Sequence, residues 1–245
     1  MQRNGEKVTE YNVAQRYIPC ESIFQRIEKA NDNVQTYFVS PFGNEPAFTF
    51  HEIRKQVLRL ARKKGEKYIY TYSPEPDNTM HKYGVGSARV KRKIKKINKT
   101  VEKLCKKLKN SVVVVTADHG LVDSKRDFIE EHSSIWKMLK RPASIEPRAL
   151  SFFVKDEYKK VFKEEFEKEF PGKFLVLTKQ EVYDRHLFGY GAAHPRVDAF
   201  LGDFLAVAVS DLLLFNYREN DRFVAGHAGF DTREMTVPFI AIETS

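Results

Sequence analysis

Three short segments carry carboxylates and imidazoles at spacings that suit a metal ion. Asp118 and His119 follow an apolar run directly, in the segment VVVVTADHG. Asp77 and His81 are four residues apart in PDNTMHKYG, and His227 lies between small residues in AGHAGF. Carboxylate oxygens and imidazole nitrogens are the ligands that zinc and similar divalent metals take in proteins. Two carboxylates and three imidazoles from three segments therefore predict a transition-metal site.

The strand expected before Asp118 and His119 determines how this pair is presented. Val112 to Val115 form a continuous apolar run, which predicts a strand buried on both faces. Ligands gather beyond the carboxyl ends of the strands in open parallel sheets, where this pair would lie. Taken alone, the triplet has a simpler interpretation, in which Asp118 caps the next segment and His119 makes a loop hydrogen bond. The other two segments favour the metal site.

The other two segments also adjoin expected strands. Tyr68 to Tyr72 are rich in β-forming residues, and the prolines that follow stop the strand before Asp77. A spacing of four allows Asp77 and His81 to meet one ion from a turn or from a first helical turn. The apolar run Thr236 to Ile242 follows the segment of His227. We therefore expect all three segments at strand ends.

The segments PDNTMHKYG, TADHG and GHAGF, in this order, resemble the metal-binding motifs of the alkaline phosphatase superfamily. Within it they are most similar to the type I phosphodiesterase and nucleotide pyrophosphatase family. The resemblance implies that Asp77, His81 and His227 hold one metal ion, and that Asp118 and His119 hold a second. It implies zinc as the metal, with manganese as the alternative. It also implies an α/β fold, a three-layer α/β/α sandwich with a mostly parallel central sheet, here incomplete.

The activity implied by the resemblance is hydrolysis of a phosphodiester or pyrophosphate bond, with a nucleotide or another small phosphoester as substrate. A phosphomonoesterase or sulfatase relative is an alternative, because these enzymes share the two-metal core. A non-catalytic protein that keeps the fold and a metal is another. Lys82 and His194 are weak candidates for substrate contacts, and both also fit ordinary surface roles. No role is assigned to three further histidines without evident partners: His51, His132 and His186.

One departure from the family pattern concerns the catalytic nucleophile. Family members begin with a strand that carries an Asp ligand of the second metal, followed by a Thr or Ser nucleophile at a helix N-terminus. Neither is found here, since Thr9 and Ser22 follow no buried strand with an acidic ligand. No catalytic residue is therefore assigned, and the second metal has only two ligands. We expect the chain to be slow or inactive alone and to pair with a missing N-terminal half.

Length and composition predict one α/β domain. A chain of 245 residues with 42% hydrophobic residues can bury a sizeable core, and residues 124–190 are expected to form a cap or insert. The sequence has no signal-like start and no long apolar run, which predicts a cytoplasmic protein without membrane contact. Cys20 and Cys105 have neither metal-type spacing nor a disulfide framework, so both are expected to be packed thiols.

The net charge of +9 comes largely from one segment. Between Arg89 and Lys109 there are eleven Lys or Arg residues and one acid, Glu102. They surround a narrow apolar stripe, which favours a solvated outer helix over a nucleic-acid surface because no aromatic residues interleave them. No specific binding of nucleic acid is therefore expected.

The periodicity along the chain alternates between helices and strands, as in β-α-β units with parallel strands. The expected helices are Ser22 to Ala30, Phe48 to Lys64, Ser87 to Lys109, Asp156 to Phe170 and Lys179 to His186. Further strands are expected at Val34 to Val39, Arg148 to Lys155, Phe174 to Thr178 and Phe204 to Ser210. Leu121 to Pro147, rich in charge, are expected to form an irregular excursion over the active-site face.

Overall fold

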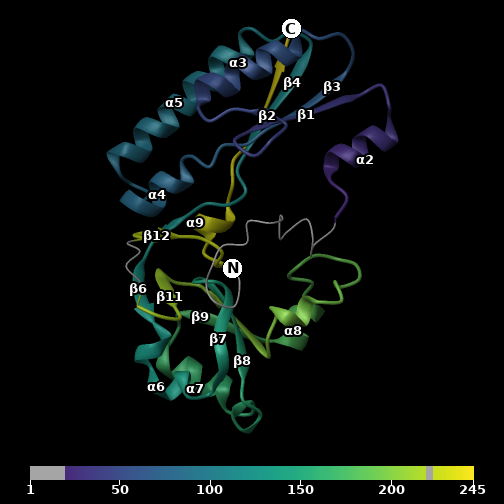
Figure 1. Ribbon diagram of the computed structural model, residues 1–245. Coiled ribbons are helices and arrows are strands. Elements are labelled where there is room, and N and C mark those ends of the chain that lie inside the picture. Colours follow the sequence, from purple (N-terminus) through teal and green to yellow (C-terminus); the bar gives the residue numbers. More distant parts are fainter. Residues whose placement is uncertain (1–19, 219–222) are drawn as a thin grey trace. The chain divides into compact units, whose positions relative to one another are not determined.

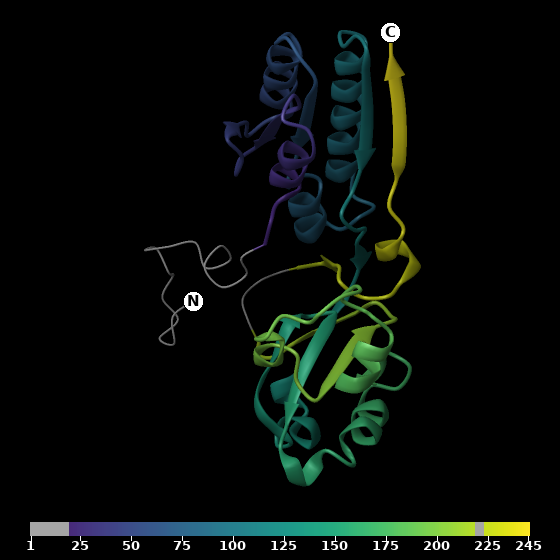
Figure 2. The same ribbon diagram turned by 90° about the vertical axis from the view of Figure 1, so that its right-hand side faces the viewer.

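The computed structural model describes residues 20–218 and 223–245 (Figures 1 and 2). The chain divides into two compact units, the first comprising Met1–Ser73 and Ile97–Lys109, and the second Pro74–Lys96 and Asn110–Ser245. All five predicted metal ligands belong to the second unit. Thr9 lies outside the described residues.

The first unit is a parallel sheet of strand order β2-β1-β3 with helices on both faces. Its elements are α2 (Ile23–Ala30), β1 (Gln35–Ser40), β2 (Glu45–Pro46), α3 (Phe50–Ala61) and β3 (Lys67–Thr71). The Phe24 ring of α2 packs against Phe38 of β1, whereas Leu60 of α3 belongs to the cluster around Val39. Successive strand residues point to opposite faces, so the two helices cover opposite faces of the sheet. This is the layering expected of an α/β/α sandwich.

The second unit contains the other described elements. Its helices are α4 (Asp77–Tyr83), the first part of α5 (Ala88–Cys105), η1 (Ile129–Glu131), α6 (Ser133–Trp136), η2 (Asp156–Tyr158), α7 (Phe162–Glu169), α8 (Lys179–Asp184), η3 (Val197–Ala199) and α9 (Thr232–Met235). Its strands are β4 (Ser111–Thr116), β5 (Val122–Asp123), β6 (Lys125–Phe128), β7 (Leu139–Glu146), β8 (Ala149–Val154), β9 (Phe174–Thr178), β10 (Phe204–Ala208), β11 (Leu212–Phe215), β12 (Ala225–Gly226) and β13 (Phe239–Thr244).

The largest core lies on an antiparallel sheet of strand order β7-β8-β10-β9. Phe204 and Ala206 of β10 pack in a cluster with Phe162 and Phe166 of α7. Leu205, between them in the sequence, belongs to a second cluster with residues of α8. Helices α7 and α8 therefore lie on opposite faces of this sheet, as Figure 1 shows.

Side-chain caps set where several helices begin. Thr49 accepts a hydrogen bond from the Glu52 N–H, and the Glu52 carboxylate accepts one from the Thr49 N–H. Thr178 and Glu181 repeat the arrangement at the start of α8. This is the pattern of a Ser or Thr followed three residues later by a Glu, so these helix starts are encoded locally.

Strand β4, which leads to Asp118, differs from its prediction. It pairs antiparallel with β13, and Figure 2 shows the two strands side by side. Val112 is 71% exposed and Val114 is 51% exposed, while Val113 and Val115 are partly buried. The prediction of a strand buried on both faces is therefore wrong, because no described element covers the face of Val112 and Val114.

Three further expectations are also corrected. The stretch from Leu121 to Pro147 is regular, since it forms β5, β6, η1, α6 and β7. The helix expected from Asp156 to Phe170 is broken after η2, and Val161, at the break, is 43% exposed. Cys20, expected to be a packed thiol, is exposed. No helix in the described part of the chain is both long and apolar enough to cross a bilayer.

Candidate metal centre

Helix α4 presents the first two candidate ligands on one face. Asp77 and His81 are at positions i and i+4, and Asp77 Oδ1 lies 3.2 Å from His81 Nε2. The helix is held by Glu75, whose carboxylate accepts hydrogen bonds from the Thr79 hydroxyl at 2.6 Å and from Lys93 at 2.7 Å. Thr79 is buried in α4 and Lys93 lies in α5, so Glu75 links the two helices within the second unit.

A short pair of strands brings His227 to this helix. Strand β12 pairs antiparallel with β5, so that Gly226, directly before His227, lies opposite Val122. Strand β5 begins just after the Asp118-His119-Gly120 turn, and the pairing therefore sets His227 beside that turn. The Val224 N–H donates to the His81 carbonyl at 2.8 Å, which joins β12 to α4.

The first group of ligands converges on one point. One ligand atom each from Asp77, His81 and His227 lie within 4.8 Å of one another, and all three residues are partly buried. Carboxylate and imidazole donors at this spacing suit a divalent ion with an open fourth position. The sequence separates His227 from the other two by well over a hundred residues, so this convergence is a property of the fold.

One buried polar atom of this group, Asp77 Oδ1, has no hydrogen-bond partner among the described residues. His81 Nδ1 lies 2.7 Å from the Ala225 carbonyl, to which it donates, so in the neutral ring Nε2 carries the lone pair. Asp77 Oδ1 lies 3.2 Å from this nitrogen. With the ring neutral these two acceptors repel unless a cation lies between them. The residues present therefore fit a divalent metal ion.

Asp118 and His119 form the second group. His119 Nδ1 lies 3.0 Å from the Gly120 carbonyl, which leaves Nε2 as the ligand atom, and Nε2 is 3.8 Å from Asp118 Oδ1. The His119 ring stacks on the His227 ring with centroids 3.8 Å apart, so this group adjoins the first. The Asp118 side chain is 63% exposed. An ion held here by two protein ligands would bind more weakly than one held by three.

The protonation state of His227 also suits metal binding. Burial lowers the pKa of His227, and the neighbouring imidazoles of His119 and His81 lower it further, against the opposing effect of Asp77 and Asp118. The ring is therefore neutral near pH 7, and a neutral imidazole is the form that binds a metal.

The two candidates for substrate contacts, Lys82 and His194, interact with residues outside these two groups. Lys82 is exposed, and its ammonium lies 5.5 Å above the Tyr83 ring. His194 lies in an exposed loop, and its Nδ1 accepts a hydrogen bond from the Arg196 N–H at 3.1 Å. Ser22 caps α2 in the first unit. None of these contacts indicates a role in substrate binding or catalysis.

Several residues that shape the centre were not singled out from the sequence. The Ala225 carbonyl fixes the tautomer of His81, and the Phe223 ring meets the His81 ring edge-on with centroids 4.9 Å apart. Glu75 anchors α4. A backbone carbonyl carries no sequence signal, whereas Glu75, two residues before Asp77, could have been suspected from its position.

A profile of the type I phosphodiesterase / nucleotide pyrophosphatase family matches residues 7–231. The chain belongs to this family. The match includes the segments of Asp77 and His81, of Asp118 and His119, and of His227. No curated protein matches the chain in sequence.

Several solved structures are similar in fold to this chain. Murine ectonucleotide pyrophosphatase / phosphodiesterase 5, in an inactive form with AMP, aligns with a TM-score of 0.66 and 14% identity, over 89% of this chain and 62% of that one. The human protein gives 0.65 and 15%, over 89% and 62%. Phosphonoacetate hydrolase from Sinorhizobium meliloti 1021, with phosphonoacetate, gives 0.64 and 15%, over 92% and 68%. The fold is thus alkaline-phosphatase-like, and this family member spans 62% of the length of the two pyrophosphatases.

Proposed function

We propose that this family member is a metal-dependent hydrolase of phosphodiester or pyrophosphate bonds in nucleotides or related small phosphoesters. The observation that carries the proposal is the convergence of Asp77, His81 and His227, with a buried carboxylate oxygen facing an imidazole lone pair. Family membership supports the class of reaction. The AMP bound to the murine relative is consistent with a nucleotide as substrate.

In this proposal each ligand group holds one ion. Asp77, His81 and His227 would hold the first and leave a position open for substrate, and Asp118 and His119 would hold the second. Two divalent ions supply charge neutralisation at the phosphoryl oxygens and lower the pKa of an attacking hydroxyl. We propose zinc, with manganese as the alternative, because two carboxylates and three imidazoles suit both metals.

We further propose that a segment outside these 245 residues supplies the hydroxyl nucleophile and one more ligand for the second ion. One observation supports this: the chain spans 62% of the length of its pyrophosphatase relatives. Without that segment we expect slow but measurable, metal-dependent turnover.

An activity assay with two substrates tests the proposal. The chain is incubated with bis-p-nitrophenyl phosphate, a diester, or with p-nitrophenyl phosphate, a monoester, after removal of metal and then with added zinc or manganese. Metal-dependent turnover of the diester that is lost in His227→Ala and in Asp118→Asn would support the proposal. His51→Ala, at an exposed imidazole in the first unit to which no role is assigned, serves as the control and should behave like the wild type.

The same assay separates the alternatives. Preference for the monoester would indicate a phosphomonoesterase relative, and turnover of an aryl sulfate in place of both phosphates would indicate a sulfatase relative. Tight metal binding without any turnover would contradict an enzymatic role for this chain by itself and indicate a metal-binding protein. Failure to bind zinc or manganese would overturn the metal centre.

A further inference from the structure

The loop that carries His227 rests on a buried ion pair that belongs to none of the three motifs. Arg148, directly before β8, and Glu234, in α9, have side chains that are 0% and 1% exposed. Arg148 Nε donates to Glu234 Oε2 at 2.9 Å and Nη2 donates to Oε1 at 2.5 Å, a bidentate arrangement. Arg148 Nη1 donates to the Leu212 carbonyl at 3.1 Å. The pair is therefore anchored in the core of the second unit.

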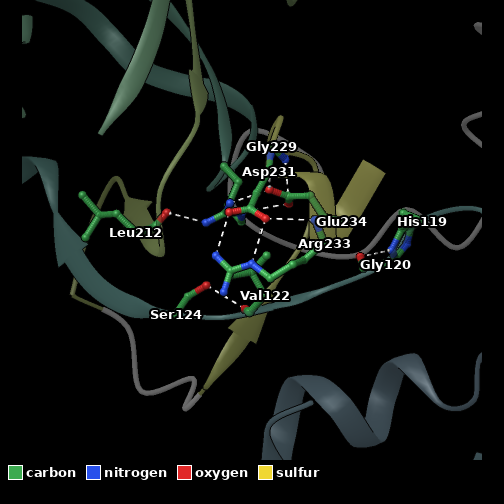
Figure 3. A network of polar contacts seen from close by, with 10 residues as sticks. His119, Gly120, Val122, Ser124, Leu212, Gly229, Asp231, Arg233 and Glu234 are labelled. Atoms are coloured by element: carbon green, nitrogen blue, oxygen red, sulfur yellow. Dashed lines mark hydrogen bonds and ion pairs between the residues drawn. The ribbon is translucent and has the colours of Figure 1, made fainter. Parts of the chain in front are cut away.

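The same carboxylate binds the backbone of the His227 loop. The Gly229 N–H donates to Glu234 Oε2 at 2.9 Å, and the Asp231 N–H donates to Oε1 at 3.2 Å (Figure 3). Both donors follow His227 closely in the sequence. Glu234 thus links the backbone just after His227 to Arg148. Its carboxylate is charged, so the hydrogen bonds it accepts are stronger than those between neutral groups.

The glycines on either side of His227 let its loop lie against the ion pair. A Cβ on Gly226 would lie 2.3 Å from Leu213 Cδ2 and 3.2 Å from Arg148 Cδ. A Cβ on Gly229 would lie 2.5 Å from Glu234 Oε1 and 2.9 Å from Arg148 Nη2. Ala228, between His227 and Gly229, has a φ of 82°, a conformation that residues with a Cβ disfavour. Its surroundings must therefore hold the loop in this shape.

Glu234 also reaches the other ligand group, through its backbone. The Gly120 N–H donates to the Glu234 carbonyl at 2.7 Å. A Cβ on Gly120 would lie 2.2 Å from the Arg233 carbonyl oxygen, so only a glycine permits this approach. Gly120 follows His119 directly, and its carbonyl orients the His119 ring. One residue therefore contacts the loops of both His119 and His227.

We propose that Arg148 and Glu234 are positioning residues that hold His227 and His119 in their metal-binding arrangement. This inference rests on the proposed metal centre. A buried ion pair adds little net stability compared with apolar residues of similar size, but it does impose one geometry on the groups bound to it. Groups behind the direct ligands commonly change metal affinity by about 10–100-fold when they are removed. The alternative is that the pair only stabilises the fold.

Two variants of the full chain test the proposal, with zinc alone as the probe. Glu234→Gln keeps the shape and one oxygen of the side chain. Arg148→Met combined with Glu234→Gln removes both charges, in case a lone buried charge prevents folding. Zinc affinity is measured by competition with a chromophoric chelator. Hydrogen exchange at the Gly229 and Gly120 amides is measured without metal, because it reports on the loops independently of any ion.

We expect zinc to bind about 10–100-fold more weakly to the folded variants, and the two amides to exchange faster. Phe166→Leu, a change in the core of the four-stranded sheet, is the control. It should lower the melting temperature and leave zinc affinity and both amides unchanged.

Wild-type zinc affinity in the folded variants, or an equal loss of affinity in Phe166→Leu, would overturn the positioning role alone. A wild-type chain that does not bind zinc would instead overturn the metal centre on which the role depends.

Discussion

The imidazole rings of His119 and His227 stack with their centroids 3.8 Å apart, although the two residues come from motifs far apart in the sequence. Each ring has a nitrogen available to a metal ion. When both rings are neutral, no charge repulsion opposes their stacking. The contact joins the three-ligand group to the two-ligand group. We therefore propose that the five residues form one centre, and we expect loss of His227 to affect both groups.

The first prediction is that divalent metal stabilises the folded chain through this centre. A ligand that binds only the folded state at about 100 times its Kd raises the free energy of unfolding by about 2.7 kcal/mol. We expect added zinc to raise the melting temperature of the wild type and to have little effect on His227→Ala. Differential scanning calorimetry of metal-free and zinc-loaded protein measures this. An equal rise in His227→Ala would show that zinc binds elsewhere.

The second prediction concerns the close approach of α9 to the turn after His119. A Cβ on Gly120 would lie 2.2 Å from the Arg233 carbonyl oxygen, so Gly120→Ala must push backbone apart. We expect a loss of about 1–3 kcal/mol in the free energy of unfolding, measured by urea denaturation. Gly86→Ala is the matched control, because a Cβ on Gly86 meets no atom within 4 Å. Its effect should stay within about 0.5 kcal/mol, and an equal loss in both variants would contradict the argument.

The sequence predicted the parts of the centre that depend on local spacing. Asp77 and His81 meet because a spacing of four places them on one helical face. Several element bounds were predicted within a few residues, as for β9, because periodicity and caps are local signals. The parallel strands of the first unit and its flanking helices also follow the expected layering.

The parts that failed depend on partners distant in sequence. A run of valines predicts an apolar strand, but it does not indicate which face of the strand other elements cover. The exposure of Val112 was therefore not predicted. Arg148 and Glu234 are 86 residues apart, and nothing in either segment signals the other. His132 was considered to have no partner, yet it bridges Asp127 and Glu169, the latter 37 residues away.

The third prediction follows from that bridge. His132 Nδ1 lies 2.6 Å from Glu169 Oε1, and Nε2 lies 3.0 Å from Asp127 Oδ1. Partial burial lowers the pKa of His132, but the hydrogen bonds to Asp127 and Glu169 outweigh this effect and raise it above its usual value of 6.5. Because the folded-state pKa is the higher one, the stabilisation is fully present below pH 6.5 and is lost as the pH rises through the folded-state pKa.

Urea denaturation of metal-free protein between about pH 6 and pH 9 measures this loss against His132→Gln. We expect the wild type to be more stable than the variant by about 1 kcal/mol at the acidic end, with the difference shrinking as the pH rises. A difference that stays constant across this range would show that His132 contributes by packing against Phe170, whose ring centroid lies 4.7 Å away, and not by its charge.

The fourth prediction is that Asp77→Asn stabilises the metal-free chain while it removes metal binding. Asp77 Oδ1 is buried, has no hydrogen-bond donor among the described residues, and lies 3.2 Å from His81 Nε2, which carries the lone pair of the neutral ring. An asparagine amide in its place can donate to that nitrogen, which removes the repulsion and adds a hydrogen bond worth about 1 kcal/mol. The neutral amide is a poorer metal ligand than a carboxylate, so zinc affinity should fall. When a binding site holds groups that repel each other in the absence of the ligand, replacing one of those groups often makes the ligand-free protein more stable.

Asp118→Asn is the matched control for this change, because it makes the same replacement at a side chain that is 63% exposed and that accepts a hydrogen bond from the neighbouring His119 N–H. In metal-free protein we expect a higher melting temperature for Asp77→Asn and an unchanged one for Asp118→Asn. A zinc titration of the same samples should show the larger loss of affinity in Asp77→Asn, since its group holds three ligands. If Asp77→Asn lowers the melting temperature without metal, the carboxylate is satisfied in the free protein and the case for an ion between Asp77 and His81 fails.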